Sequence, residues 1–165
     1  MKNFDINGRF HVQHLDNNGK VKGEYDFPNG IVDEGLNHCL NTQFNSGAQV
    51  NPWYIGLIDN AGFSALAAGD TAAEINGTNG WAELSEYTEA VRQDWTEGAA
   101  AARSMTNAVT VDFSINATKT IKGIFVVSTS TVDGVGGTLW STAAFASTVS
   151  AVNGDTLKIT YTVSG

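Results

Sequence analysis

Apolar and polar side chains alternate in two neighbouring segments near the start of the chain. Phe10, Val12 and His14 share one face of the first segment, and residues 21–27 repeat the alternation. Between the two segments, residues 16–19 read Asp-Asn-Asn-Gly, which favours a tight turn. A period of two is typical of half-buried strands, so this region predicts an N-terminal β-hairpin.

The hydrophobic period changes after residue 30, and the sequence predicts a helix over residues 31–44. Apolar residues recur there at every fourth position and would form one stripe along the helix: Val32, Leu36, Leu40 and Phe44. Asp33 and Glu34 would complement the helix dipole in the first turn. Residues 45–47 (Asn-Ser-Gly) would end the helix.

The middle of the chain holds one clear element and one irregular stretch. Residues 53–58 (Trp-Tyr-Ile-Gly-Leu-Ile) are apolar on both faces, which predicts a central strand. Residues 63–103 show little periodicity. Segments of this length without regular structure are uncommon in compact domains and usually functional. We expect short turns and helices that wrap around the domain.

Alternation returns in the last third of the chain and predicts four more strands, over residues 109–115, 121–127, 138–145 and 157–163. Many short strands with one early helix indicate a mainly β fold, an antiparallel β-sandwich of the jelly-roll kind. The chain has 165 residues, which suits a single domain. Residues 1–8 would be a possible arm, and residues 63–103 an irregular wrapping segment.

Charge and composition exclude several classes of partner. Seventeen acidic against nine basic residues give a net charge of -8, which would repel a phosphate backbone or an anionic membrane. We therefore expect no nucleic-acid or membrane partner. The chain has no run of about 20 apolar residues and no apolar leader. We expect synthesis in a cytoplasm, where the single Cys39 needs no disulfide.

The histidines do not predict a metal or catalytic site. His11 and His14 are three residues apart on an expected strand and would point to opposite faces. His38 and Cys39 are adjacent on the expected helix, where their side chains would diverge by about 100°. We therefore predict no catalytic residue, no cofactor and no metal ligand.

Five carboxylates lie close to aromatic residues within the irregular stretch: Glu83, Glu86, Glu89, Asp94 and Glu97. Paired acids beside aromatic rings are typical of glycoside hydrolases, and carbohydrate-binding modules use such rings too. Alternatively, Glu83 and Glu86 form a solvated face while Trp81 and Trp95 anchor the segment to the domain or to a neighbouring subunit. Packing or assembly is the interpretation that we prefer. No common hydrolase, zinc or redox motif is present.

Several segments together resemble a family of small virion proteins of tailed bacteriophages. The segments that carry the resemblance extend over nearly the whole chain: residues 8–31, 53–63, Gly80, Trp81, Glu86, Tyr87, Arg92, Trp95, 99–103, 121–128 and 137–161. The resemblance implies a structural role on the virion, after synthesis in the host bacterial cytoplasm. The family offers no catalytic motif to transfer to this chain, so we expect no enzymatic activity.

Within that family, we expect a capsid decoration (cement) protein that bridges coat subunits and stabilises the head. The alternative is a tail or fibre component, including a module that binds host-surface glycans. The chain lacks the repeats or heptads of fibre shafts, which favours the first interpretation. The expected partner is the major capsid protein or another virion protein.

The aromatic residues also predict self-assembly. The four tryptophans exceed the needs of a small core, and assembly surfaces favour aromatic residues. We therefore expect a homo-oligomer, with a trimer as the favoured state. The expected contact surface combines the N-terminal arm with the irregular stretch and comprises Phe4, Ile6, Trp81, Tyr87 and Trp95.

Overall fold

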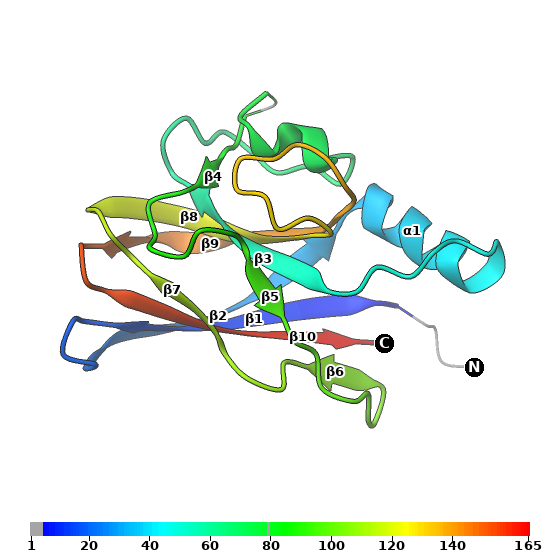
Figure 1. The fold of residues 1–165 in the computed structure, drawn as a ribbon, viewed down its shortest axis with the longest axis horizontal. Coiled ribbons are helices and arrows are strands. Elements are labelled where there is room, and N and C mark those ends of the chain that lie inside the picture. The colour runs from blue at the N-terminus through cyan, green and yellow to red at the C-terminus, as the bar shows by residue number, and fades with distance from the viewer. Residues whose placement is uncertain (1–4, 79) are drawn as a thin grey trace.

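The computed structural model describes residues 5–78 and 80–165, which form a curled antiparallel sheet with one α-helix at its end (Figure 1). The strands are β1 (Asn7–Leu15), β2 (Val21–Ile31), β3 (Trp53–Asp59), β4 (Glu83–Leu84), β5 (Gln93–Trp95), β6 (Ser104–Thr106), β7 (Val111–Ser114), β8 (Lys119–Val127), β9 (Leu139–Ala151) and β10 (Thr156–Ser164). The helix α1 spans Asp33–Phe44, and a short 3-10 helix, η1, spans Ala72–Ile75. The predicted mainly β, antiparallel, sandwich-like fold with one helix is confirmed.

The predicted N-terminal hairpin is formed by β1 and β2. Phe10 on β1 lies opposite Phe27 on β2. In the turn, the carboxylate of Asp16 accepts hydrogen bonds from the backbone N–H groups two and four residues later, at 2.8 and 2.9 Å. Gly19 follows with a φ of 78°, a conformation that glycine adopts without steric cost. The polar turn sequence therefore sets the register of the hairpin.

Strand β2 connects the two layers of the curled sheet. Most of β2 pairs with β1, whose other edge pairs with β10. At its end, Gly30 and Ile31 pair with β9, which leads to β8 and β3. Figure 1 shows β1 and β10 in one layer and β3, β8 and β9 in the other. The layers are therefore parts of a continuous, sandwich-like sheet.

The main core lies between these layers and is built from the apolar positions of the alternating strands. Phe10 and Tyr161 stack there with ring centroids 4.4 Å apart. Other buried members include Ile55, Leu57, Phe113, Ile124 and Leu157. Because alternate side chains on a strand point to opposite faces, the period-two pattern of the sequence determines which residues enter this core.

Strand β3 is apolar on both faces because both faces are covered. It pairs with β8 along one edge and with β4 and β5 along the other, as expected of a central strand. Ile55 and Leu57 face the main core, whereas Ile58 joins a second buried cluster with Trp81 and Phe125. The irregular segment completes that cluster with Phe63, Leu66, Ala72 and Ile75. The segment 63–103 thus wraps over the sheet.

The predicted C-terminal strands are present, but the bounds of all four differ from the predicted ones, most of all at the end of β9. Strand β7 begins at Val111, and Val109 before it is 65% exposed. Strand β9 continues well beyond residue 145, to Ala151. Its register against β8 shifts between Ile121 and Gly123, so an irregularity in the ladder lets the strand continue past the predicted end.

Candidate functional site

The first turn of α1 attaches the helix to β9. A side chain at Gly35 would place its Cβ 2.4 Å from the backbone oxygen of Trp140, so only glycine allows this close approach. Val32, just before the helix, donates its N–H to the same oxygen at 3.1 Å. The carboxylate of Glu34 accepts the N–H of Leu139 at 2.6 Å. The helix is therefore held at its N-terminal end.

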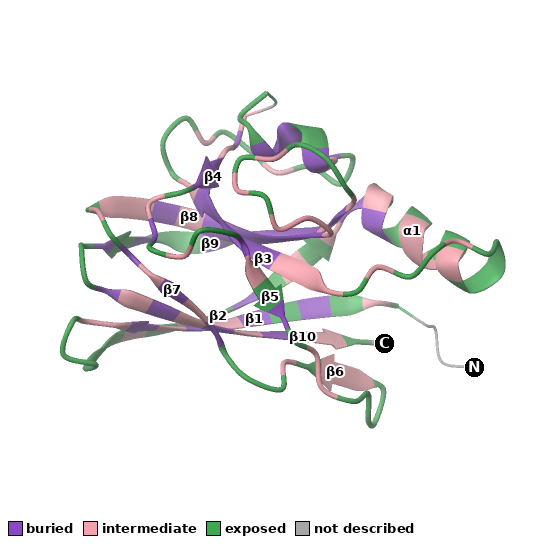
Figure 2. Cartoon of the chain, in the orientation of Figure 1, coloured by how far each residue is buried: buried purple, intermediate pink, exposed green. Residues whose placement is uncertain are grey.

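The apolar stripe of α1 lies mostly outside the core. Of the four stripe residues, Val32 is 1% exposed, but Leu36, Leu40 and Phe44 are 38%, 56% and 80% exposed. Figure 2 shows α1 projecting from the end of the sheet, with exposed and half-buried residues along its later turns. The periodicity predicted the helix correctly, yet three of its apolar residues face solvent. Contiguous exposed apolar surface of this kind marks interaction sites.

These three side chains help to line a groove of about 930 Å³, which we call the α1 groove. Trp53 from β3 and Trp140 from β9 also line it, with ring centroids 5.7 Å apart and planes inclined by 50°. His38 packs edge-on against Trp53 at 5.5 Å. The other lining residues are Asp5, Ile6, Cys39, Thr42, Gln43, Gln49 and Val50. Its size and apolar lining are those of a binding site.

Among the described residues, the formal charge that lines the α1 groove is negative. Asp5 is the one charged residue among the described residues that line it. Residues 31–53, which supply most of the lining, contain no lysine or arginine. The last turn of α1 has no basic residue, so the negative end of the helix dipole is not compensated there by the helix itself.

The structure places three of the expected contact residues in the core. Trp81, Tyr87 and Trp95 are 1%, 4% and 5% exposed, so their assignment to an exposed contact surface is corrected. The irregular segment turns these rings inward, and both indole N–H groups donate to side-chain oxygens of the chain at 3.0 and 3.1 Å. Ile6 is half-buried and lines the α1 groove. Phe4 lies outside the described residues.

At least four of the five carboxylates that suggested glycan chemistry have partners within the chain, and one of them, Glu97, accepts a hydrogen bond from the Asn51 side chain at 3.3 Å. Glu83 is not on a solvated face, because it forms a buried ion pair with Arg92 at 2.8 Å. Glu86 binds Lys119 at 2.7 Å, and Glu89 accepts a backbone N–H of β7 at 3.1 Å. These carboxylates therefore support the local structure of the irregular segment.

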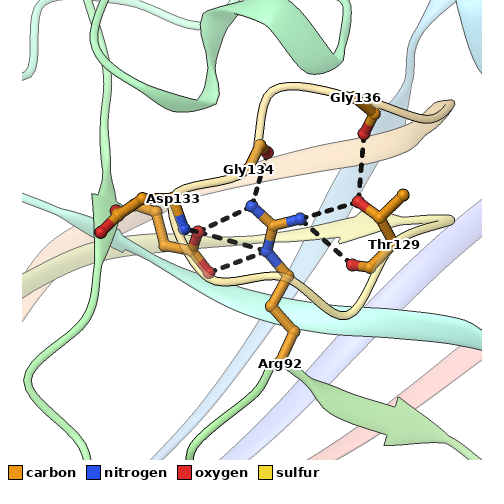
Figure 3. Close-up of polar contacts among 6 residues, drawn as sticks. Arg92, Thr129, Asp133, Gly134 and Gly136 are labelled. Carbon is orange, nitrogen blue, oxygen red and sulfur yellow. Dashed lines mark hydrogen bonds and ion pairs between the residues drawn. The ribbon is translucent and has the colours of Figure 1, made fainter.

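Arg92 also holds the loop between β8 and β9. Its guanidinium donates to the backbone oxygens of Thr129 and Gly134 at 3.1 and 2.8 Å (Figure 3). The carboxylate of Glu83 in turn accepts the N–H of Asp133 at 2.7 Å. Burial raises the pKa of Glu83, and the hydrogen bonds and charge of Arg92 oppose that shift. The polar groups of Arg92 and Glu83 therefore bind each other and the β8–β9 loop, and their role is structural.

The histidines of β1 point to opposite faces, as predicted. His14 is 2% exposed, and its Nε2 lies 2.7 Å from the carboxylate of Asp155, which Lys22 also contacts at 2.6 Å. His11 lies on the other face, 3.2 Å from Asp26. Across residues 5–78 and 80–165, no group of three or more His, Cys, Asp or Glu side chains is arranged to hold a metal ion.

The chain matches no protein-family model and no curated protein. Within the described part of the chain, no helix is long and apolar enough to cross a membrane. The candidate site is therefore identified by its own geometry: the α1 groove combines exposed apolar side chains with a concave shape.

Sequence reasoning did not select Leu40, Phe44, Trp53 or Trp140 as contact residues. Two signals pointed toward them: the regular apolar stripe of the helix and the surplus of tryptophans. Neither signal shows which side of a helix the sheet leaves uncovered. That distinction depends on where α1 sits relative to β3 and β9.

Proposed function

We propose that this chain is a non-enzymatic structural protein of a bacteriophage particle and acts as a capsid decoration, or cement, protein. The observation that carries the proposal is the exposed apolar surface of Leu36, Leu40 and Phe44 beside Trp53 and Trp140. A surface of this kind favours attachment to another protein. The resemblance to small virion proteins supplies the context in which that attachment takes place.

The partners of the acidic side chains support a role without catalysis. A glycosidase needs two carboxyl groups that flank an open substrate site. Here Glu83 is buried against Arg92, and Glu86 is bound to Lys119. Incubation with bacterial capsular glycans or peptidoglycan should therefore release no reducing sugar, and Glu86→Gln should behave as the wild type. Sugar release that Glu86→Gln abolishes would contradict a non-enzymatic role.

A cement protein stabilises a head by adding contacts across boundaries between coat subunits. Each copy contributes a modest interface, and many copies act together against the internal pressure of packaged DNA. The expected partner is the major capsid protein or another virion protein, and the expected location is the virion. Self-association into a trimer remains part of the proposal, and sedimentation of the isolated protein tests it.

The proposal is tested on purified particles of the phage that encodes this chain. Quantitative mass spectrometry, scaled to the major coat protein, should find hundreds of copies per particle. Leu40→Glu should lower occupancy and the temperature at which particles release DNA. Val109→Glu, which alters an exposed apolar residue outside the groove lining, is the matched control and should bind normally. A handful of copies per particle would contradict the cement role.

One feature of the groove favours a second candidate, a tail or fibre component that binds host-surface glycans. The lining contains the rings of Trp53 and Trp140 as well as the amide side chains of Gln43 and Gln49, and aromatic surfaces combined with hydrogen-bonding groups suit sugar rings. The same variants distinguish the two roles. Normal occupancy of Leu40→Glu on the particle, together with reduced adsorption to host cells, would favour the second candidate.

A further inference from the structure

The exposed stripe of α1 limits the length and form of a segment that can bind in the α1 groove. Leu36, Leu40 and Phe44 lie on successive turns of the helix, so they span about 12 Å along its axis. Their increasing exposure, from 38% to 80%, leaves the C-terminal end of the stripe most open. An extended or helical segment with several apolar side chains in a row would cover this length.

The charge around the groove restricts the occupant further. The lining holds Asp5 as its charged residue, within the described residues, and the helix end beside Phe44 carries the negative pole of the dipole without a basic side chain in the last turn. A bound segment with lysine or arginine next to its apolar side chains would place positive charge near Asp5 and near the negative pole of the helix dipole. An acidic segment would be repelled by both.

A second copy of this chain in a two-fold contact fits these features poorly. The chain carries a net charge of -8, and residues 31–53, which supply most of the groove lining, contain no lysine or arginine. In a two-fold contact the same patch faces itself, so both sides would bring the negative groove without a compensating cation. Charge complementarity therefore favours a different protein.

We propose that the α1 groove binds a segment of another protein in which apolar side chains are flanked by lysine or arginine. The inference deepens the proposed function, on which it rests in using the groove as the contact surface. In the occupied groove, the apolar side chains cover Leu36, Leu40 and Phe44, and a cationic group lies near Asp5. The partner is recognised by this combination and not by either part alone.

Three short synthetic helical peptides with a fluorescent label test the proposal. The first carries Leu or Phe at every fourth position with flanking lysines, the second has glutamates in place of the lysines, and the third keeps the lysines but has serine at the apolar positions. Fluorescence anisotropy with the full chain should show the first peptide binding at least about tenfold tighter than either of the others. Its affinity should also fall as salt is raised.

Variants of the chain test whether the peptide binds in the α1 groove. Leu40→Glu should weaken the first peptide about tenfold or more, and Leu40→Ala should weaken it less. Asp5→Lys should weaken the first peptide and strengthen the second, because it reverses the charge in the lining. Val109→Glu is the matched control and should leave both affinities unchanged. Circular dichroism melting curves verify that each variant is folded.

Several results would overturn the inference. These are no binding of the lysine-flanked peptide, equal binding of the glutamate-flanked peptide, or no effect of Leu40→Glu. Self-association that Leu40→Glu abolishes would identify a second copy as the occupant. Absence of the protein from particles, with peptide binding as expected, would overturn the proposed function and leave this inference standing. Normal particle occupancy of Leu40→Glu would show that the particle contact lies elsewhere.

Discussion

Arg92 and Glu83 form an ion pair in the interior of the protein, where both side chains are 0% exposed. The Nε and Nη2 atoms of Arg92 donate to the two carboxylate oxygens at 2.9 and 2.8 Å. Removing both charges from water is costly, and only good geometry with further hydrogen bonds offsets that cost. The guanidinium also binds the loop that joins β8 to β9, so the pair fixes that loop against the sheet.

Removing one member of this pair should strongly destabilise the fold. Arg92→Met leaves the carboxylate of Glu83 buried without its partner, and should lower the free energy of unfolding by about 3–5 kcal/mol. The double variant R92M/E83L removes both charges and should lose less than R92M alone. Urea denaturation measures the free energy of unfolding of the wild type, R92M and R92M/E83L. A double variant that is less stable than R92M would show that the ion pair is not the source of the loss.

An exposed ion pair provides the control for this prediction. Lys158 and Asp112 are bound to each other, but their side chains are 35% and 41% exposed. Lys158→Met should therefore change the free energy of unfolding by less than about 1 kcal/mol. A loss as large as that of Arg92→Met would mean that burial does not decide the difference between the two pairs.

Charging the exposed stripe of α1 should leave stability almost unchanged. Leu40 is 56% exposed, so Leu40→Glu should alter the free energy of unfolding by no more than about 0.5 kcal/mol. Leu57 is 0% exposed, and Leu57→Ala should cost about 2–5 kcal/mol. Thermal unfolding of both variants tests the contrast. Comparable losses would place Leu40 in the core and remove the basis of the α1 groove as a contact surface.

A methyl group at Gly35 should push α1 away from β9. The added Cβ would lie 2.4 Å from the backbone oxygen of Trp140, where the backbone itself must shift. Gly35→Ala should cost about 1–3 kcal/mol. Gly69→Ala is the matched control, because nothing lies within 4 Å of its added Cβ, and it should be neutral or slightly stabilising. Chemical denaturation that shows no difference between them would contradict the close approach.

Acid should remove part of the stability through Asp155. Burial opposes ionisation of this carboxyl, but hydrogen bonds from Lys22, the N–H of Val152 and His14 outweigh burial and lower its pKa. A lowered pKa in the folded state stabilises the protein above the unfolded value of about 3.9, and the gain is lost as the pH falls through the folded pKa. Asp155→Asn should therefore be less stable at neutral pH by about 1–3 kcal/mol.

The pH profile separates this effect from a general loss of charge. Urea unfolding from about pH 7 to about pH 2 should show a shallower acid decline for Asp155→Asn than for the wild type. Glu24→Gln removes an exposed carboxylate that binds Gln13 on the neighbouring strand and is the control. An acid decline of Asp155→Asn as steep as that of the wild type would contradict a role for the Asp155 carboxylate.

Much of the fold could be predicted from local patterns. Alternation identified the β1–β2 hairpin and the C-terminal strands, the four-residue period identified α1, and two apolar faces identified β3 as central. These predictions hold because the periods of strand and helix are properties of the backbone itself. The exact extent of β9 was not predicted, since a register shift against β8 depends on how two distant segments pair.

The sequence by itself therefore determined the elements and the alternating faces of the strands, whereas the tertiary structure decided which apolar and charged residues are covered. Trp81 and Trp95 turned inward because the irregular segment folds over the sheet, and Glu83 entered the interior because Arg92 lies beside it there. Leu40 and Phe44 stayed exposed because α1 projects past the strands that would have covered it. Burial depends on which distant segments meet, and no local period encodes that.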